Sequence, residues 1–82
     1  MNKLIIFSAS WCSPCKRLKN TLESLNDYSN IKVYDIDISV EKAIEWRVDA
    51  VPTIILVNDQ GEELKRTLGV LPKEKLLELL NA

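Results

Sequence analysis

Two cysteines are the residues of this 82-residue chain whose type and spacing could do chemistry. They stand in the run Trp11-Cys12-Ser13-Pro14-Cys15, with two residues between them. That spacing lets the two sulfurs meet on one turn of chain, so that a disulfide can close and open reversibly. The thiolate is the attacking species in such exchange, and Cys-x-x-Cys sites lower the pKa of the thiol. The pattern therefore predicts a redox-active pair.

The strand and the helix predicted on either side of the two cysteines determine their position and exposure. The apolar run Lys3 to Ser8 predicts a buried strand before it, and Ser13-Pro14 opens a helix directly after Cys12. A helix N-terminus offers free N–H groups and partial positive charge, and both favour a thiolate. We expect Cys12 to be the exposed nucleophile and Cys15, one turn further, to be shielded and to resolve the mixed disulfide. Lys16 adds a nearby positive charge.

The remaining elements follow from hydrophobic periodicity and turn residues. The first helix buries Cys15, Leu18, Leu22 and Leu25 and should end at Asn26-Asp27. Further on, the sequence predicts a strand at 31–36, a short helix at 40–47, strands at 54–57 and 62–68, and a last helix opened by Pro72. Ser39 suits the N-cap of the short helix, which we expect to bury Val40, Ala43 and Ile44.

The order β-α-β-α-β-β-α indicates one α/β domain over residues 1–82. The first two strands should be parallel through a right-handed crossover, and the last two should form an antiparallel hairpin across the turn at 58–61. The charges of the strand at 62–68 suggest an edge. The expected architecture is a four-stranded mixed sheet flanked by three helices.

Composition excludes several function classes. Eleven Lys and Arg against twelve Asp and Glu, with five aromatic residues, argue against nucleic-acid or anionic-membrane binding. The chain has no histidine and only two cysteines, so one copy cannot supply a zinc or iron–sulfur site of the usual kind. The apolar run Leu4 to Phe7 is too short for a signal peptide. We therefore expect a cytoplasmic protein without metal, and a monomer by default.

The residues around the pair resemble those of the thioredoxin family. The run Trp11-Cys12-Ser13-Pro14-Cys15-Lys16 differs from the usual thioredoxin active site only at Ser13, where glycine is common. The segment Val51-Pro52-Thr53 is similar to the family's cis-proline segment, and Gly69 to its loop glycine. The resemblance covers nearly all of the chain. The sequence shows no counterpart of the family's N-terminal strand and helix. The expected fold is therefore a minimal thioredoxin fold, which glutaredoxins also use.

The resemblance implies a protein disulfide reductase with Cys12 as nucleophile and Cys15 as resolving cysteine. The peptide bond before Pro52 would be cis and would face the cysteines. The implied substrate-binding residues are Trp11, Ser13, Pro14, Val51, Pro52 and Gly69. No bound cofactor is implied, because electrons would come from NADPH through a separate thioredoxin reductase, or from glutathione.

Two positions depart from the family's pattern. Ile6 stands where thioredoxins usually carry a buried aspartate that manages the proton of the second cysteine, and Val33 stands where they usually carry a lysine. Our hypothesis from the sequence is that water takes the proton of Cys15.

Three other interpretations stay open. A glutathione-dependent, glutaredoxin-like enzyme fits the chain length, although glutaredoxins typically have proline directly after the first cysteine. A non-enzymatic docking module would leave the cysteines incidental, and two copies could share a metal ion. Trp46, on the short helix, is expected to serve packing rather than function.

Overall fold

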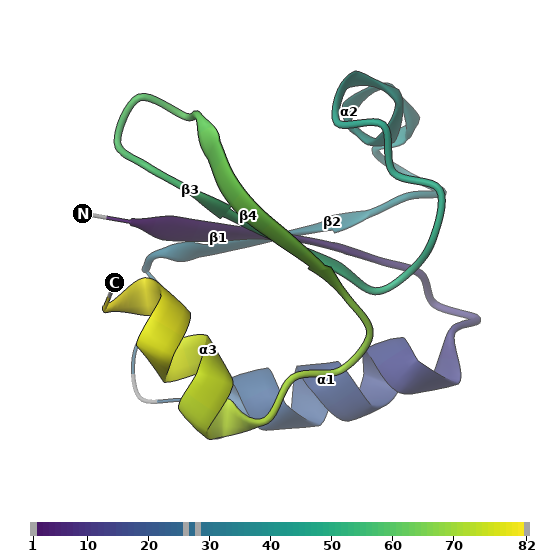
Figure 1. Ribbon diagram of the computed structural model, residues 1–82. Coiled ribbons are helices and arrows are strands. Elements are labelled where there is room, and N and C mark those ends of the chain that lie inside the picture. Colours follow the sequence, from purple (N-terminus) through teal and green to yellow (C-terminus); the bar gives the residue numbers. More distant parts are fainter. Residues whose placement is uncertain (1, 26, 28, 82) are drawn as a thin grey trace.

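The structure is a computed structural model that describes residues 2–25, 27 and 29–81. Its elements are β1 (Lys3–Ser8), α1 (Ser13–Glu23), β2 (Ile31–Asp35), α2 (Val40–Glu45), β3 (Thr53–Val57), β4 (Glu63–Leu68) and α3 (Lys73–Leu80) (Figure 1). The predicted order of elements is confirmed.

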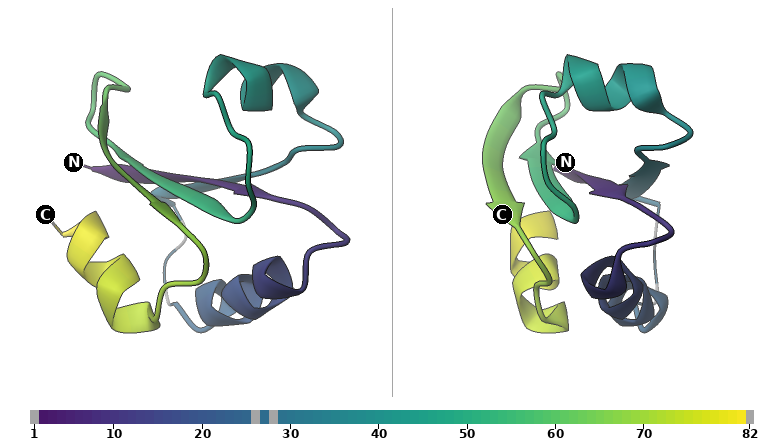
Figure 2. Two further views of the ribbon diagram at one scale, coloured as in Figure 1. Left: turned by 45° about the vertical axis from the view of Figure 1, so that its right-hand side comes forward. Right: turned by 90° about the vertical axis from the view of Figure 1, so that its right-hand side faces the viewer.

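The four strands form one mixed sheet in the order β2-β1-β3-β4. β1 pairs with β2 in parallel, as a strand-helix-strand crossover requires, and β3 pairs antiparallel with both β1 and β4. The charged strand β4 lies at an edge, as predicted. Helices α1 and α3 cover one face of the sheet and α2 covers the other (Figures 1 and 2).

Side chains of the central strands pack alternately into two hydrophobic cores, because successive residues of a strand point to opposite faces of the sheet. Beneath α1 and α3 the core consists of Leu4, Ile6, Leu18, Leu22, Leu25, Ile54, Leu56 and Leu76. On the α2 face, Phe7 packs with Ile55 and Val57, and the partly buried Trp46 lies against them. The expected packing role of Trp46 is thereby confirmed, and both cores hold the carboxyl end of β1 in place.

Helix α1 ends earlier than predicted, at Glu23 rather than at Asn26-Asp27, and Asn26 lies outside the described residues. Ser24 supplies the reason. Its hydroxyl donates to the carbonyl of Thr21 over 2.6 Å, as does its backbone N–H over 3.1 Å. A serine that bonds nearby backbone competes with continuation of the helix.

The prediction for the short helix was partly wrong. α2 stops at Glu45, and Val40 and Ile44 are 49% and 71% exposed, while Ala43 is half-buried. Six residues present only one narrow side to the sheet. Arg47 ends the helix with φ of 54°, a left-handed conformation typical of helix C-termini. Ser39 occupies the predicted N-cap position, but its side chain makes no capping bond within the described chain.

Candidate active site

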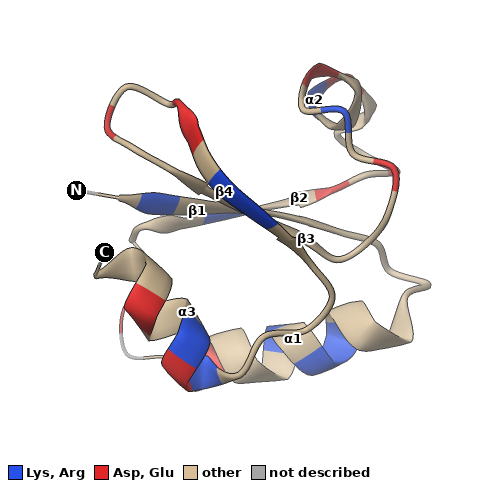
Figure 3. Cartoon of the chain, in the orientation of Figure 1, with Lys and Arg blue, Asp and Glu red and all other residues tan. Residues whose placement is uncertain are grey.

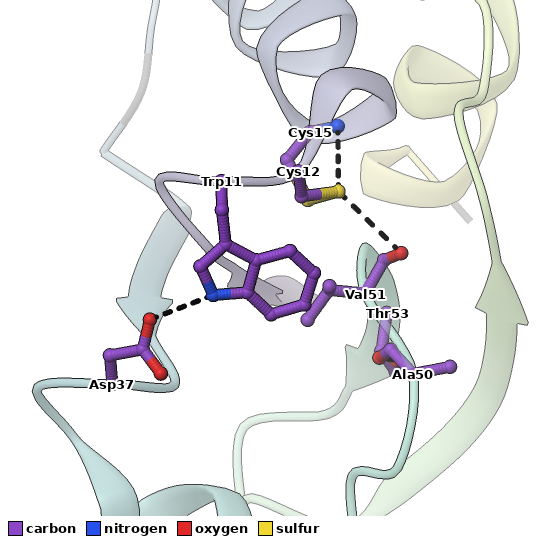
Figure 4. Close-up of a disulfide and its surroundings, with 7 residues drawn as sticks. All are labelled: Trp11, Cys12, Cys15, Asp37, Ala50, Val51 and Thr53. Atoms are coloured by element: carbon purple, nitrogen blue, oxygen red, sulfur yellow. Dashed lines mark hydrogen bonds between the residues drawn. A yellow bond between two sulfur atoms is a disulfide. The ribbon is translucent and has the colours of Figure 1, made fainter.

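The two cysteines form a disulfide at the N-terminus of α1, with their Cα atoms 5.2 Å apart. Cys12 is the N-cap residue, and Pro14 stands in the first turn, where its missing N–H breaks no helical bond. The backbone N–H of Cys15 donates to the Sγ of Cys12 over 3.2 Å (Figure 4). The first turn of the helix therefore directs a hydrogen-bond donor at the first sulfur.

Both cysteines are buried in this oxidised state, with exposures of 5% for Cys12 and 4% for Cys15. The shielding of Cys15 is as predicted, whereas the expected exposure of Cys12 was wrong. The residue lies in an apolar cluster with Ala9, and Ile36 and Val51 pack against that cluster. The carbonyl oxygen of Val51 lies 3.7 Å from the Sγ of Cys12. The loop before β3 thus faces the pair, as the resemblance implied, and it covers the sulfur of Cys12.

This loop carries the expected cis peptide bond, between Val51 and Pro52. Two hydrogen bonds hold the loop in place. The hydroxyl of Thr53 donates to the carbonyl of Ala50 over 2.6 Å, and the backbone N–H of Gly69 donates to the carbonyl of Pro52 over 2.9 Å. Gly69 has φ of 88°, a left-handed conformation that suits glycine. The structure therefore joins three of the predicted site segments, although they are far apart in the sequence.

Trp11 lies beside the pair with 65% of its surface exposed. Its indole N–H donates to the carboxylate of Asp37 over 2.9 Å (Figure 4). This bond connects the ring to the loop between β2 and α2. The backbone N–H of Asp37 in turn donates to Asp35 over 2.8 Å. Sequence reasoning missed Asp37. The only available signal was an acidic residue just beyond the end of a strand.

An open groove of about 500 Å³ lies behind the disulfide, between α1 and the sheet. Its lining residues are Ile6, Ser8, Ala9, Ser10, Cys15, Lys16, Leu18, Lys19, Leu22, Val33 and Asp35. Cys15 therefore borders a space large enough for water, even though its own surface is almost fully buried. The two positions that depart from the family's pattern, Ile6 and Val33, both lie on this groove.

Charges are divided across the site. The basic residues of α1 are Lys16, Arg17 and Lys19, of which the two lysines line the groove, whereas acidic residues follow β2 (Figure 3). Within the described residues, no group of three His, Cys, Asp or Glu side chains could hold a metal ion. None of the helices in the described part of the chain is long and apolar enough to cross a membrane.

Comparisons with known proteins agree with this geometry. The family model described as Thioredoxin matches residues 1–82. Thioredoxin from Chlamydia muridarum is 40% identical over 81 residues, which are 95% of this chain and 78% of the relative. Thioredoxin from Staphylococcus epidermidis is 39% identical over 83 residues, covering 96% of this chain and 79% of the relative.

Solved structures show the same fold. Oxidised mitochondrial thioredoxin 3 from Saccharomyces cerevisiae superposes with a TM-score of 0.76 and 27% identity, covering 99% of this chain and 78% of that one. A mutant thioredoxin from Halobacterium salinarum gives a TM-score of 0.80 and 29% identity, covering 98% of this chain and 72% of that one.

Proposed function

The chain belongs to the thioredoxin family and is a thiol–disulfide oxidoreductase, and from this premise we propose that Cys12 is its nucleophile and Cys15 its resolving cysteine. The observation that carries the assignment is the hydrogen bond from the backbone N–H of Cys15 to the Sγ of Cys12. Such a donor stabilises a thiolate more than a thiol. Charge therefore develops at Cys12, at the open end of the helix.

The reaction takes two exchange steps. The thiolate of Cys12 attacks one sulfur of a substrate disulfide, forms a mixed disulfide and releases the first substrate thiolate, which takes a proton from solvent. Cys15 then loses its proton and attacks the Sγ of Cys12. The second substrate thiolate leaves, and the Cys12–Cys15 disulfide seen here is formed. The protein loses two electrons and the substrate gains them.

We assign substrate contact to the surface around the pair. Ser13 is exposed, and Pro14 and Val51 are half-buried. Pro52 is buried and shapes this surface from beneath, where its carbonyl accepts the hydrogen bond from Gly69. Trp11 adds an exposed aromatic face beside them. A substrate chain that placed its disulfide over Cys12 would meet this apolar rim, and the small Gly69 would leave room for it.

Disulfide-containing proteins are the substrates and a reductase is the partner that the family implies. We propose that the electrons come from NADPH through a thioredoxin reductase, that the protein works as a monomer in the cytoplasm, and that it holds no cofactor of its own. Glutathione is the alternative donor.

Reduction of insulin disulfides tests the proposal. One assay supplies NADPH and thioredoxin reductase, and the other supplies NADPH, glutathione and glutathione reductase. We expect turnover in the first assay, loss of it in Cys12→Ser, and trapping of a mixed disulfide in Cys15→Ser. Turnover with glutathione alone would favour the glutaredoxin-like interpretation. Turnover that survives the double Cys12→Ser/Cys15→Ser change would contradict both.

A further inference from the structure

We infer that Asp35 accepts the proton of Cys15, through water in the groove behind the disulfide, when Cys15 resolves the mixed disulfide. The inference rests on the proposed roles of the two cysteines. Asp35 acts through water and does not touch the reacting sulfurs, so it is a positioning residue.

The need for an acceptor follows from the burial of Cys15. Only a thiolate attacks a disulfide at a useful rate, and burial among apolar groups disfavours the charged form of a thiol. Cys15 is 4% exposed and belongs to an apolar cluster. The nearby side chain of β1, Ile6, is buried and holds no titratable group. The groove that Cys15 lines offers the proton a path to water.

The groove brings Asp35 to the same side of the sheet as Cys15. Residues two apart on a strand point to the same face, and in the parallel register Ile6 stands opposite Val33 and Ser8 opposite Asp35. All four residues line the groove together with Cys15. With about 500 Å³ of space against roughly 30 Å³ for each water in the liquid, the groove has room for a chain of water molecules.

Asp35 is the one carboxylate among the described residues that line the groove. The other charged groups there are Lys16 and Lys19 of α1, which carry protons already and cannot accept one. The backbone N–H of Asp37 bonds to the Oδ1 of Asp35 over 2.8 Å and fixes its orientation. This arrangement provides a fixed acceptor, where the sequence suggested water alone.

The thiol of Cys15 gives its proton to water, and the water gives a proton to the carboxylate of Asp35. The thiolate of Cys15 then forms a bond to the Sγ of Cys12, and the bond from Cys12 to the substrate sulfur breaks. The proton on Asp35 passes back through water to the departing substrate thiolate or to solvent.

Stopped-flow reaction of the reduced protein with 4,4′-dithiodipyridine separates this step from the first one. Attack by Cys12 releases one thiopyridone, and attack by Cys15 releases a second, so two phases of absorbance report the two cysteines. The reagent is uncharged near neutral pH, which removes a direct effect of charge on binding. The variants are Asp35→Asn, Asp35→Glu and, as a matched loss of one charge on an exposed loop, Asp27→Asn.

We expect Asp35→Asn to slow the second phase about tenfold near neutral pH while the first phase is unchanged. A directly placed acid or base typically contributes about 10²–10⁴-fold, and intervening water lowers the effect. The rate of the wild-type second phase should also decrease at acidic pH as a carboxylate is protonated. Asp35→Asn should remove this pH dependence, and Asp35→Glu should retain it. Asp27→Asn should match the wild type in both phases.

The inference would be overturned if a folded Asp35→Asn variant kept both the wild-type rate of the second phase and its decrease at acidic pH. It would also be overturned by a second phase that Asp35→Glu leaves as slow as Asp35→Asn, because that result indicates a structural role. Absence of the first phase in the wild type, or its persistence in Cys12→Ser, would instead contradict the proposed function. Thermal unfolding of each variant establishes that it is folded.

Discussion

The backbone N–H of Cys15 donates a hydrogen bond to the Sγ of Cys12 across the first turn of α1, over 3.2 Å. The donor belongs to the main chain, so it survives any change of the Cys15 side chain. Because only the first sulfur receives it, the helix distinguishes two residues that are otherwise equally buried.

The first prediction is that the pKa of the Cys12 thiol lies below the ordinary value of about 8.5. In the reduced Cys15→Ser variant, only Cys12 contributes to the absorbance of thiolate near 240 nm, and the main-chain donor is retained. Titration should give a lower pKa for the folded protein than for the same variant in denaturant. Identical curves in the two states would show that the helix N-terminus does not stabilise the thiolate.

The second prediction concerns Asp37, which holds Trp11 by a 2.9 Å hydrogen bond. Asp37→Ala should release the indole and lower kcat/KM for insulin reduction by roughly three- to tenfold, the equivalent of about one hydrogen bond. The loss should be shared with Trp11→Phe, because both changes remove the same contact. The kcat/KM of the double variant should therefore be no lower than that of the less active single variant.

Asp27→Ala is the control for the loss of charge, since Asp27 lies in an exposed loop. Additive losses from the two single changes would contradict the view that Asp37 acts by positioning Trp11.

Much of this fold could be predicted because local patterns determine it. The apolar run of β1, the proline at the start of α1 and the turn before β4 each specify their own element. The disulfide followed from the spacing of the two cysteines, and the cis bond at Pro52 followed from the resemblance of its segment to the thioredoxin family. These features need few long-range contacts to be recognised.

The features that sequence reasoning missed depend on tertiary packing. Cys12 is buried although its place at the start of a helix predicted exposure, and Asp37 bonds Trp11 across 26 residues. Ile44 was expected inside from its apolar character, but α2 is too short to bury it. The groove and its carboxylate arise only once β1 and β2 are in register. The periodicity of a sequence does not indicate contacts between residues so far apart along the chain.

The third prediction uses the two glycines, which both have left-handed φ angles, 79° at Gly61 and 88° at Gly69. An added Cβ would meet nothing within 4 Å among the described residues at either position. Alanine should therefore cost stability only through backbone strain, about 1–2 kcal/mol in each case by urea unfolding. The two variants should differ in activity.

Gly61→Ala should keep full activity, since Gly61 lies in the turn before β4, apart from the proposed site. Gly69→Ala should lower kcat/KM as well, because strain at Gly69 disturbs its hydrogen bond to Pro52 and the added methyl group lies on the proposed substrate path. Equal activity in the two variants would contradict the substrate role of Gly69.

The last prediction concerns Arg66, which forms an ion pair within β4 and hydrogen bonds to the end of α2. Arg66 bonds Glu63 over 2.8 Å, and its guanidinium also donates to the carbonyls of Trp46 and Arg47 over 2.7 and 3.3 Å. The hydrogen bond from Arg66 holds the pKa of Glu63 below its ordinary value, and the same bond raises the pKa of Arg66. Arg66 therefore stays charged throughout the range in which Glu63 titrates.

The sign of the pH effect follows from the direction of the Glu63 shift. A carboxyl whose pKa is lower in the folded state stabilises the protein above its unfolded pKa, here near 4.5, and this contribution is lost as the pH falls through the folded value. Glu63→Gln should thus reduce the free energy of unfolding by about 0.5 kcal/mol at pH 7, as for other surface pairs. The gap between variant and wild type should close in acid.

Arg66→Gln should cost more, about 1–2 kcal/mol, because two backbone carbonyls lose a charged donor as well. The control is Glu78→Gln, which breaks the more exposed Lys75–Glu78 pair of α3. That pair bonds no second element in the described structure, so its loss should change the unfolding free energy very little. Urea unfolding between about pH 3 and pH 7, the range that spans the carboxylate titration, measures all three variants. A Glu63→Gln gap that stays constant over this range would show that the ionised carboxylate is not what Arg66 stabilises.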